Sequence, residues 1–337
     1  MKALRCLAPH NVQIVEVPNP QPLQHDLLIK PIATGICGTD IEIIEGGVDP
    51  AFIHYPITLG HEWVGRVVAA TGGSSSILAG SRVVVEGIIP CSSCEECQNG
   101  ATNRCETYDE IGFTRDGAAA EFISAPEHLA HALSDNVSDE SAALVEPAAV
   151  VFQGLTKLEI KSHAKILVVG DGTIGLLATA MLKKFTPAHV DVFGIRAEQR
   201  EMVIKAGATR FITEVAELTN DYHYVIEAAG AIAAVELAIS QGRRGAKVLL
   251  LGYPEQAARL QLGVHDLINR DLTIYASFSY TRDSWKAVVE LLNSGAVDLT
   301  FIVTHRFGME EWQHAIEVLR KSTGQPRGKV LLTLNPH

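Results

Sequence analysis

The stretch Lys165–Gly175 reads KILVVGDGTIG, and it decides the fold of the second half of the chain. Its first part, Lys165–Gly170, is a short run rich in β-branched residues, which is typical of a buried strand. A glycine-rich turn of the form G-x-G-x-x-G follows, and Ile174–Lys184 then repeats apolar residues at helical spacing. A strand, a tight turn and a helix in this order predict a βαβ unit, in which the next strand runs parallel to the first.

The residues after about position 147 continue this alternation of strand-like and helix-like segments. We expect a helix at Glu198–Ala206, and strands at His189–Phe193, Arg210–Thr213, Tyr224–Ala228, Lys247–Leu251 and Leu272–Ala276. Strands that alternate with helices predict right-handed crossovers and a parallel, doubly wound sheet of the Rossmann type. We therefore expect an α/β domain at residues 148–278.

The first 147 residues have a different character. Short strand-like runs, such as Asp26–Pro31, Gly65–Ala69 and Ser81–Glu86, are divided by clusters of Gly, Pro and Ser. This pattern favours a β-rich, barrel-like domain with functional loops. The tail, residues 279–337, contains two helical patterns, Asp283–Asn293 and Glu310–Lys321, and a strand pattern, Lys329–Thr333, and we expect it to return to the first domain.

The glycine-rich turn is a candidate dinucleotide site. Its glycines permit a tight turn, a close approach of the backbone to a pyrophosphate, and close packing of helix on strand, while the helix N-terminus favours negative charge. The alternative is a merely structural turn, and Asp171 would repel a pyrophosphate unless its side chain points away. The candidate cofactor ligands in this turn are Gly170, Gly172, Thr173, Ile174 and Gly175.

The end of the second expected strand bears on the choice of nicotinamide cofactor. An NAD site usually carries an acidic residue about twenty positions after the glycines, but the sequence there is Gly194-Ile195-Arg196. An arginine can pair with a 2′-phosphate, so Arg196 favours NADP, and Arg200 is a further candidate ligand. In the alternative, Arg196 is simply solvated and Asp191 serves NAD.

Four cysteines crowd into one polar loop at residues 88–108. A structural zinc ion takes four thiolates in a closed tetrahedral shell, and metal binding would supply folding energy that the polar loop lacks. Four unrelated free cysteines and an iron–sulfur cluster are the alternatives, whereas a DNA-binding finger is disfavoured because no basic helix accompanies the loop. The expected ligands are Cys91, Cys94, Cys97 and Cys105.

A second set of metal-binding residue types is scattered along the chain and can converge only in the fold. It comprises Cys37, His61, Glu62 and Glu146. Catalytic zinc takes three protein ligands and keeps one position open, and Cys, His and a carboxylate satisfy this requirement. Taken alone, however, His61 could be a satisfied core histidine and Cys37 a small buried residue.

The segments GICGTD (residues 35–40) and GHE (residues 60–62), the four-cysteine loop and the G-x-G-x-x-G turn together resemble the zinc-dependent medium-chain alcohol and polyol dehydrogenases. The resemblance covers nearly the whole chain. It implies that Cys37 and His61 bind a catalytic zinc and that Glu62 approaches the metal from behind. Glu146 stands where simple alcohol dehydrogenases have cysteine, which indicates the sorbitol dehydrogenase-like, polyol branch.

The same resemblance implies catalytic roles on the segment after Cys37. Thr39 matches a residue whose hydroxyl bonds the substrate oxygen and takes its proton, and Asp40 matches the acid that orients the histidine ligand. Glu42 departs from the family, which commonly has a histidine there as the next step of the proton path. The implied reaction moves a hydride between a secondary alcohol and a nicotinamide cofactor.

The substrate is expected to be a polyol, sugar or cyclitol, with a hydroxy amino acid similar to threonine or a simple secondary alcohol as alternatives. Candidate recognition residues are Glu42, Arg115, Asp116, Arg282 and Trp285, and His54 either lines the pocket or lies on a surface loop. A non-catalytic dinucleotide-binding protein is the alternative from another class.

Composition excludes several other kinds of partner. Lys and Arg number 28 and Asp and Glu 39, so the net charge is −11, which disfavours binding to nucleic acid or an anionic membrane. The N-terminus lacks a signal-peptide pattern and no run is long enough to span a membrane, so we expect a cytoplasmic protein. The family resemblance suggests a homodimer or homotetramer.

Overall fold

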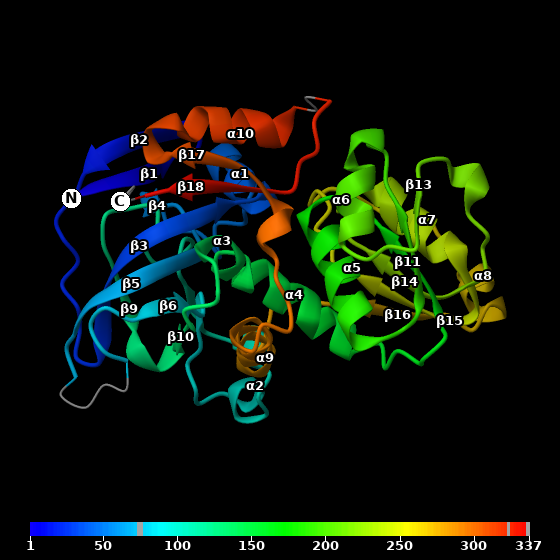
Figure 1. Cartoon of the computed structure of the whole chain (residues 1–337), viewed down its shortest axis with the longest axis horizontal. Helices are drawn as coiled ribbons and strands as arrows, with labels where there is room; N and C mark the ends of the chain where they lie inside the picture. The colour runs from blue at the N-terminus through cyan, green and yellow to red at the C-terminus, as the bar shows by residue number, and fades with distance from the viewer. Residues whose placement is uncertain (73–76, 322–323, 335–337) are drawn as a thin grey trace. The chain divides into compact units, whose positions relative to one another are not determined.

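The computed structural model describes residues 1–72, 77–321 and 324–334, and the chain divides into two compact units (Figure 1). The first unit comprises Met1–Glu146, Thr281–Thr323 and Lys329–His337. The second comprises Pro147–Tyr280 and Gly324–Gly328. The chain therefore leaves the first unit at Pro147, returns to it at Thr281, contributes the short segment Gly324–Gly328 to the second unit and returns to the first at Lys329.

The second unit is built on a six-stranded sheet whose strand order is β13-β12-β11-β14-β15-β16, with every neighbouring pair parallel. This order reverses between β11 and β14, as a doubly wound sheet requires, and confirms the expected Rossmann-type α/β fold. The strands are β11 (Lys165–Val169), β12 (His189–Phe193), β13 (Arg210–Ile212), β14 (Tyr222–Glu227), β15 (Gly242–Leu250) and β16 (Thr273–Ala276).

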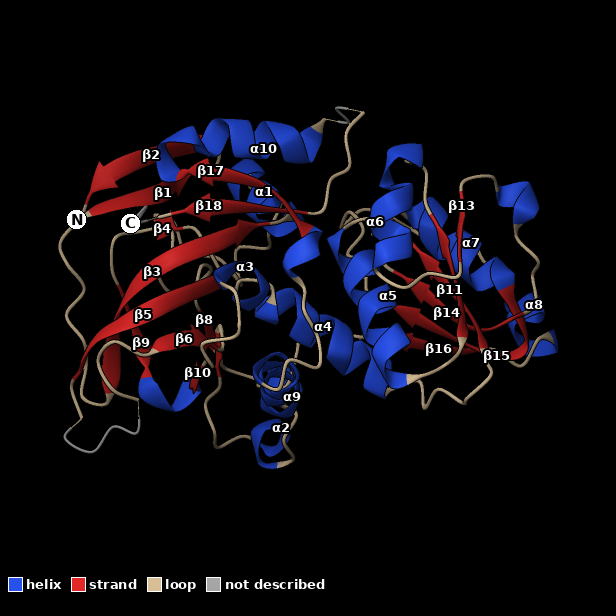
Figure 2. Cartoon of the chain, viewed as in Figure 1, coloured by secondary structure: helices blue, strands red, loops and turns tan. Residues whose placement is uncertain are grey.

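Helices lie on both faces of this sheet (Figure 2). They are α5 (Thr173–Phe185), α6 (Arg200–Lys205), α7 (Ile232–Gln241) and α8 (Val264–Asn269), with 3-10 turns η3 (Ala197–Gln199) and η4 (Val215–Glu217). The sheet presents continuous apolar runs because both faces are covered; Leu167, Val169, Val225 and Val248 are each at most 2% exposed. The expected helix at 198–206 begins as the 3-10 turn η3.

The first unit is β-rich. Its largest sheet runs β10-β6-β5-β3-β18-β17, with β9 also paired to β3, and smaller sheets run β2-β1-β4 and β7-β8. The strands are β1 (Lys2–Ala8), β2 (Asn11–Glu16), β3 (Asp26–Ile36), β4 (Ile57–Thr58), β5 (Glu62–Ala70), β6 (Arg82–Val85), β7 (Ile88–Ile89), β8 (Asp109–Glu110), β9 (Ile123–Pro126), β10 (Ala130–Ala132), β17 (Val303–Gly308) and β18 (Lys329–Thr333).

Short helices and the returning tail complete the first unit. The helices are α1 (Gly38–Glu45), α2 (Glu95–Gln98), α3 (Asp139–Ala142), α9 (Arg282–Asn293) and α10 (Trp312–Arg320), with 3-10 turns η1 (Thr102–Arg104), η2 (Glu127–Leu129), η5 (Thr300–Ile302) and η6 (Met309–Glu311). α4 (Val145–Thr156) runs from the end of the first unit into the second.

Strand β18 explains why the tail belongs to the first unit. It pairs antiparallel with the central strand β3, where Val330 lies opposite Ile36. The apolar side chains of these strands join a buried cluster that also holds Cys6 and residues of α1 and α10. Among the described residues, no helix combines the length and the apolar character that a membrane crossing would need.

Candidate functional site

The segment Gly35–Asp40 places its cysteine at the junction of β3 and α1. Cys37 is the N-cap of α1: its Sγ accepts a hydrogen bond from the Thr39 backbone N–H at 3.3 Å, and its own N–H donates to Asp40 Oδ2 at 2.9 Å. This reciprocal capping box satisfies backbone donors that a helix start leaves unpaired. The capping therefore orients the Cys37 thiol and the Asp40 carboxylate from the same turn of chain.

Strand pairing brings the histidine segment to this cysteine. β3 and β5 pair antiparallel with Gly35 opposite Glu62. As a result, Cys37 Sγ lies 3.3 Å from His61 Nε2. One ligand atom from each of Cys37, His61 and Glu62 lies within 4.8 Å of the others. Zinc bonds of about 2.3 Å to sulfur and 2.0–2.1 Å to nitrogen in a tetrahedral shell would separate the two ligand atoms by about 3.5 Å, so the spacing fits a shared cation.

Electrostatics around His61 also favour a cation. Burial by itself would lower the pKa of His61, but the negative charges of Asp40 and Cys37 outweigh it and hold this pKa well above the ordinary value. Asp40 Oδ1 lies 3.6 Å from His61 Nδ1, a distance of an ion pair rather than a hydrogen bond. The buried site therefore attracts positive charge to the Cys37 side of the imidazole.

Glu62 is held by a buried lysine. Lys329, the first residue of β18, donates to Glu62 Oε2, and both side chains are only 3% exposed. Burial would lower the pKa of Lys329, but the charges of Glu62 and Cys37 outweigh it, so the pKa is raised and the lysine stays charged. The carboxylate reaches this position because residue 35 is glycine: a Cβ there would lie 2.1 Å from Glu62 Oε2.

Two further carboxylates gather near His61. Removal from water raises the pKa of Glu146, in the first turn of α4, to about 8, and the charge of Glu62 acts in the same direction. Removal from water likewise raises the pKa of Glu110, on β8, to about 7. The group of ligand atoms within 4.8 Å contains Glu62 but not Glu146. Acids that resist ionisation in this way mark a place where a cation would be stabilised.

Thr39 and Glu42 follow Cys37 on α1. They are three positions apart and so lie on neighbouring turns of the same helix face. Burial raises the pKa of Glu42, and the nearby Glu45 carboxylate adds to this rise. The raised pKa makes the Glu42 carboxylate a better proton acceptor than a solvated one.

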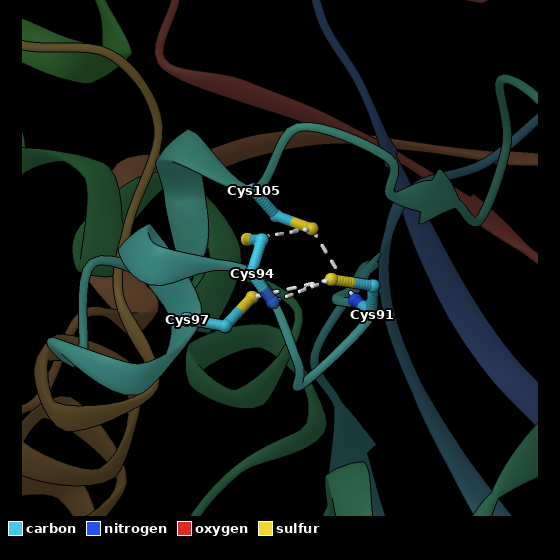
Figure 3. A group of neighbouring side chains, drawn as sticks. All are labelled: Cys91, Cys94, Cys97 and Cys105. Atoms are coloured by element: carbon cyan, nitrogen blue, oxygen red, sulfur yellow. Dashed lines mark hydrogen bonds between the residues drawn. The ribbon is translucent and has the colours of Figure 1, made fainter.

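The four-cysteine loop folds into a closed cluster (Figure 3). Cys91 Sγ lies 3.9 Å from Cys97 Sγ, and Cys94 Sγ lies 4.0 Å from Cys105 Sγ. All four sulfurs lie within 4.8 Å of one another. A tetrahedral zinc shell with bonds of about 2.3 Å requires sulfur–sulfur separations of about 3.8 Å, so the cluster fits a structural zinc ion.

The thiols in this cluster compete for ionisation. Hydrogen bonds from the backbone and hydroxyl of Ser93 lower the pKa of Cys91 to about 5. Burial and the neighbouring sulfurs raise the pKa of Cys97 to about 12. A divalent cation would relieve the repulsion among adjacent thiolates, which is the electrostatic reason such clusters bind metal.

The glycine-rich loop has the form that a phosphate site needs. Gly170 has φ +128°, and a Cβ on Gly175 would lie 2.0 Å from the Gly170 carbonyl oxygen, so both positions require glycine. Helix α5 begins at Thr173 with Gly172 as N-cap and has no side-chain cap. The N–H groups of its first turn, which include those of Thr173, Ile174 and Gly175, therefore point toward a place where phosphate oxygens can accept them.

The carboxylate of Asp171 is turned toward the end of β12. Arg196 donates to Asp171 Oδ1 through Nε at 3.0 Å and Nη2 at 2.5 Å, and the Arg196 backbone N–H donates to Oδ2 at 3.1 Å. Residue 194 must be glycine to admit this carboxylate, because a Cβ there would lie 2.4 Å from Asp171 Oδ2. The expected repulsion of a pyrophosphate by Asp171 is thus offset by Arg196.

Asp191 and Arg200 are engaged in packing. Asp191 is fully buried, and its carboxylate accepts hydrogen bonds from Arg210 Nη2 at 2.6 Å and Tyr222 Oη at 2.9 Å. These hydrogen bonds hold the Asp191 carboxylate inside the sheet. The Arg200 guanidinium lies over the Phe211 ring, 5.4 Å from its centroid.

Three of the suggested recognition residues are held within the protein: Asp116, Arg282 and Trp285. Asp116 accepts hydrogen bonds from Arg5 at 3.1 Å and from the Thr58 backbone at 2.9 Å. Arg282 pairs with the buried Glu86, and Trp285 is 1% exposed in the core. His54 is exposed, as expected of a surface loop residue.

Sequence reasoning missed four residues near the two sites: Glu110, Gln199, Arg327 and Lys329. The signal for Lys329 was present, since a lone lysine begins the apolar strand KVLLT and must find a charged partner if it is buried. The other three carry no local signal, because their significance comes from segments distant in sequence.

Comparison with known proteins assigns both units. A family model described as "Alcohol dehydrogenase GroES-like domain" matches residues 23–135, and one described as "Zinc-binding dehydrogenase" matches residues 173–294. The chain is 32% identical to an L-threonine 3-dehydrogenase of Photorhabdus laumondii, over 98% of this chain and 99% of the relative. It is 30% identical to a sorbitol dehydrogenase of Bacillus subtilis, over 94% and 93% of the two chains.

Solved structures agree with these matches. A protein of Sinorhizobium meliloti 1021, described as a zinc-binding dehydrogenase bound to NADP, superposes with a TM-score of 0.91 at 28% identity and 98% coverage of each chain. A protein of Escherichia coli CFT073, described as an alcohol dehydrogenase complexed with NADH, gives a TM-score of 0.91 at 26% identity and 99% coverage of each chain. The two neighbours thus carry different nicotinamide cofactors.

Proposed function

The chain belongs to the zinc-dependent medium-chain alcohol and polyol dehydrogenases, and from this premise we propose that it interconverts a secondary alcohol and a ketone on a small polyol, sugar or cyclitol, with NADP as its preferred cofactor. The observation that carries this proposal is the convergence of Cys37, His61 and Glu62 beside the extra carboxylate Glu146. A glutamate at position 146, close enough to these residues to feel their charge, supports the polyol branch.

Two zinc ions per chain are part of the proposal. Cys91, Cys94, Cys97 and Cys105 would hold a structural ion in a closed shell, which supports the fold of a loop that has little apolar contact of its own. Cys37 and His61 would hold the catalytic ion, with Glu146 or Glu62 as the carboxylate partner. The Lys329 ion pair favours Glu146, because it draws the Glu62 carboxylate toward the ammonium group.

Bound zinc would supply a Lewis acid that makes the substrate hydroxyl more acidic, and bound nicotinamide would accept or return the hydride. The chain's own residues supply the rest. The Thr39 hydroxyl accepts the substrate proton at Oγ1 and passes it toward Glu42 on the same helix face. The Asp40 carboxylate faces Nδ1 of His61 and stabilises positive charge on the imidazole, and Lys329 neutralises the Glu62 carboxylate.

The NADP preference rests on Arg196 and on the burial of Asp191. Arg196 lies beside the glycine-rich loop, with its guanidinium 3.8 Å from the Cβ position of Gly172. The alternative ribose ligand, Asp191, is 0% exposed and bonded to Arg210 and Tyr222. An arginine beside the loop, without an acid free to bind the ribose 2′-hydroxyl, favours a cofactor with a 2′-phosphate.

A hydroxy amino acid is the second candidate substrate. The carboxylates of Glu42 and Glu110 could accept hydrogen bonds from the hydroxyls of a polyol or from the ammonium group of an amino acid. The identity to L-threonine 3-dehydrogenases supports the second reading, and that to sorbitol dehydrogenase the first.

We also propose a homo-oligomer formed through the cofactor-binding unit. β16 is the terminal strand of its sheet and carries Ile274, which is 37% exposed; the preceding helix α8 carries Val264 and Ile268, which are 67% and 72% exposed. An edge strand with apolar neighbours is a template for pairing with a second copy. Light scattering after size-exclusion chromatography would give the number of subunits.

The proposed function is tested by absorbance at 340 nm during oxidation of polyols, sugars, cyclitols and hydroxy amino acids, with NADP and with NAD, after zinc content has been measured. Faster turnover of a polyol, sugar or cyclitol with NADP supports the proposal. Turnover of L-threonine alone would move the assignment to the second candidate. Turnover only with NAD would remove the NADP preference.

A further inference from the structure

Glu227 is a buried acid at the carboxyl end of β14. It is the last residue of that strand and is 0% exposed. Its Oε1 accepts the backbone N–H groups of Ala229 and Gly230, each at 2.8 Å, and its Oε2 accepts the Gly252 N–H at 3.2 Å. Burial raises the pKa of Glu227, and the three N–H groups oppose this rise because they stabilise the ionised form. One carboxylate therefore fastens the loop after β14 to the loop after β15.

The two loops lie in close contact above this carboxylate. A Cβ on Gly252 would lie 2.4 Å from Glu227 Oε2 and 2.2 Å from the Gly230 nitrogen, so the contact requires glycine. Gly230 has φ +72°, and a Cβ there would lie 3.0 Å from the Tyr253 carbonyl oxygen. Ala229 and Tyr253 are exposed, whereas the glutamate is not. Glu227 thus supports, from the buried side, a surface that the two loops form.

The loop after β14 also packs against the glycine-rich loop. The Ala228 N–H donates to the Val169 carbonyl at 2.8 Å, and a Cβ on Gly170 would lie 2.9 Å from the Ala229 nitrogen. β11 and β14 are the strands between which the strand order reverses. Ligands of doubly wound sheets bind in the crevice outside the carboxyl ends of the strands at this point. The loops that Glu227 joins therefore border the cofactor crevice.

The strand order also gives the direction of the dinucleotide along this crevice. The pyrophosphate belongs at the N-terminus of α5, and the adenosine ribose belongs near the end of β12. β12 lies on one side of β11, and β14 and β15 lie on the other. The nicotinamide half must then extend over the carboxyl ends of β14 and β15, where the loops held by Glu227 lie.

We propose that Glu227 is a positioning residue for the nicotinamide half of the cofactor. Its carboxylate holds the loops after β14 and β15 together, so that their exposed backbone keeps the shape that receives the nicotinamide riboside. The carboxylate acts through these loops and touches no cofactor atom itself. The inference rests on nicotinamide binding, which belongs to the family, and depends neither on the NADP preference nor on the substrate.

The test compares each dinucleotide with the fragment that lacks nicotinamide: NADH with ADP-ribose, and NADPH with 2′-phospho-ADP-ribose. Calorimetric titration of the zinc-loaded, full-length protein measures each affinity without catalysis, and the pair whose dinucleotide binds more tightly is used for the variants. Glu227→Gln keeps an oxygen for Ala229 and Gly230 but turns an amide NH₂ toward the Gly252 N–H. Glu227→Leu removes every side-chain acceptor. Thermal unfolding confirms that each variant is folded.

Tyr222→Phe is the matched control. Tyr222 is also 0% exposed, and it is the first residue of β14, at the opposite end of the strand from Glu227. Its Oη donates to Asp191 Oδ2 at 2.9 Å, so the substitution removes one buried hydrogen bond far from the crevice. A general loosening of β14 would affect this variant and the Glu227 variants alike.

We expect Glu227→Gln to weaken the dinucleotide roughly ten-fold, the loss of a hydrogen bond to a charged group, and to leave the fragment within about two-fold. Glu227→Leu should weaken the dinucleotide further, and Tyr222→Phe should change neither affinity. The fluorescence of bound NADH or NADPH comes from the nicotinamide ring itself, and in both Glu227 variants its emission should shift toward that of the free cofactor.

Three results would overturn the inference. Equal weakening of dinucleotide and fragment would show that Glu227 only stabilises the fold. Unchanged dinucleotide affinity in folded Glu227→Gln would remove its positioning role, and the same selective loss in Tyr222→Phe would assign the effect to the whole strand. The NADP preference is measured separately, by which dinucleotide the unmodified protein binds more tightly, so its failure leaves this test intact.

Discussion

Replacing Lys329 with methionine should destabilise the first unit strongly, because it leaves the Glu62 carboxylate buried without a counter-charge. Both side chains of this ion pair are 3% exposed. Removing one partner of a buried pair costs about 3–5 kcal/mol, since the remaining charge is neither hydrated nor neutralised. For a urea m-value of about 2–3 kcal/mol/M, the unfolding midpoint should fall by roughly 1–2.5 M.

Tryptophan fluorescence reports specifically on unfolding of the first unit, to which Lys329 belongs. The chain has three tryptophans, Trp63, Trp285 and Trp312, and all belong to the first unit. Urea titrations of the zinc-loaded protein, followed at these residues, would compare Lys329→Met with Lys329→Met/Glu62→Gln. The double variant should recover at least about 2 kcal/mol, because the orphaned charge is gone. A loss below about 1 kcal/mol for the single variant, or no recovery in the double, would refute the buried-pair reasoning.

Three other perturbations have defined outcomes. The pKa of Glu110 is raised to about 7 from an ordinary 4.5, so between these pH values the folded state keeps a proton that the unfolded state releases, and the contribution of this group to stability declines as pH rises. The stability of Glu110→Gln relative to the unmodified protein should therefore be greater at pH 8 than at pH 5 in urea titrations. An equal difference at both pH values would contradict this. Asp191→Asn should lower the free energy of unfolding by about 1–3 kcal/mol at pH 7, a modest amount because Arg210 is half-exposed and can return to water. Burial alone would raise the pKa of Asp191, but Arg210 and Tyr222 hold this pKa below its ordinary 3.8, so the destabilisation should shrink as pH falls below about 4. A destabilisation that does not depend on pH would count against the ion pair. Cys97→Ser should lower metal content from two zinc ions per chain to one, measured by plasma emission spectrometry, and unchanged content would exclude this cysteine as a ligand.

Local pattern predicted much of this molecule. Strands at His189–Phe193 and Lys329–Thr333 have the predicted bounds, and the parallel α/β sheet follows from the alternation of short apolar runs with helical periods. Cys91, Cys94, Cys97 and Cys105 lie within one short loop, so chain connectivity alone keeps their sulfurs close. In these cases the signal and the structure it specifies occupy the same stretch of chain.

The tertiary structure decided the features that depend on pairing between distant segments. Glu62 was visible as a candidate, but only the return of β18 to β3 buries Lys329 against it. From the sequence, the Asp171 carboxylate is expected to repel a phosphate, but in the fold Arg196, which follows β12, pairs with this carboxylate. Burial and charge pairing are properties of the folded core, where each group's neighbours are set by strand order and not by sequence distance. The sequence by itself therefore determined which chemistry is present, and the fold determined which charges neutralise one another.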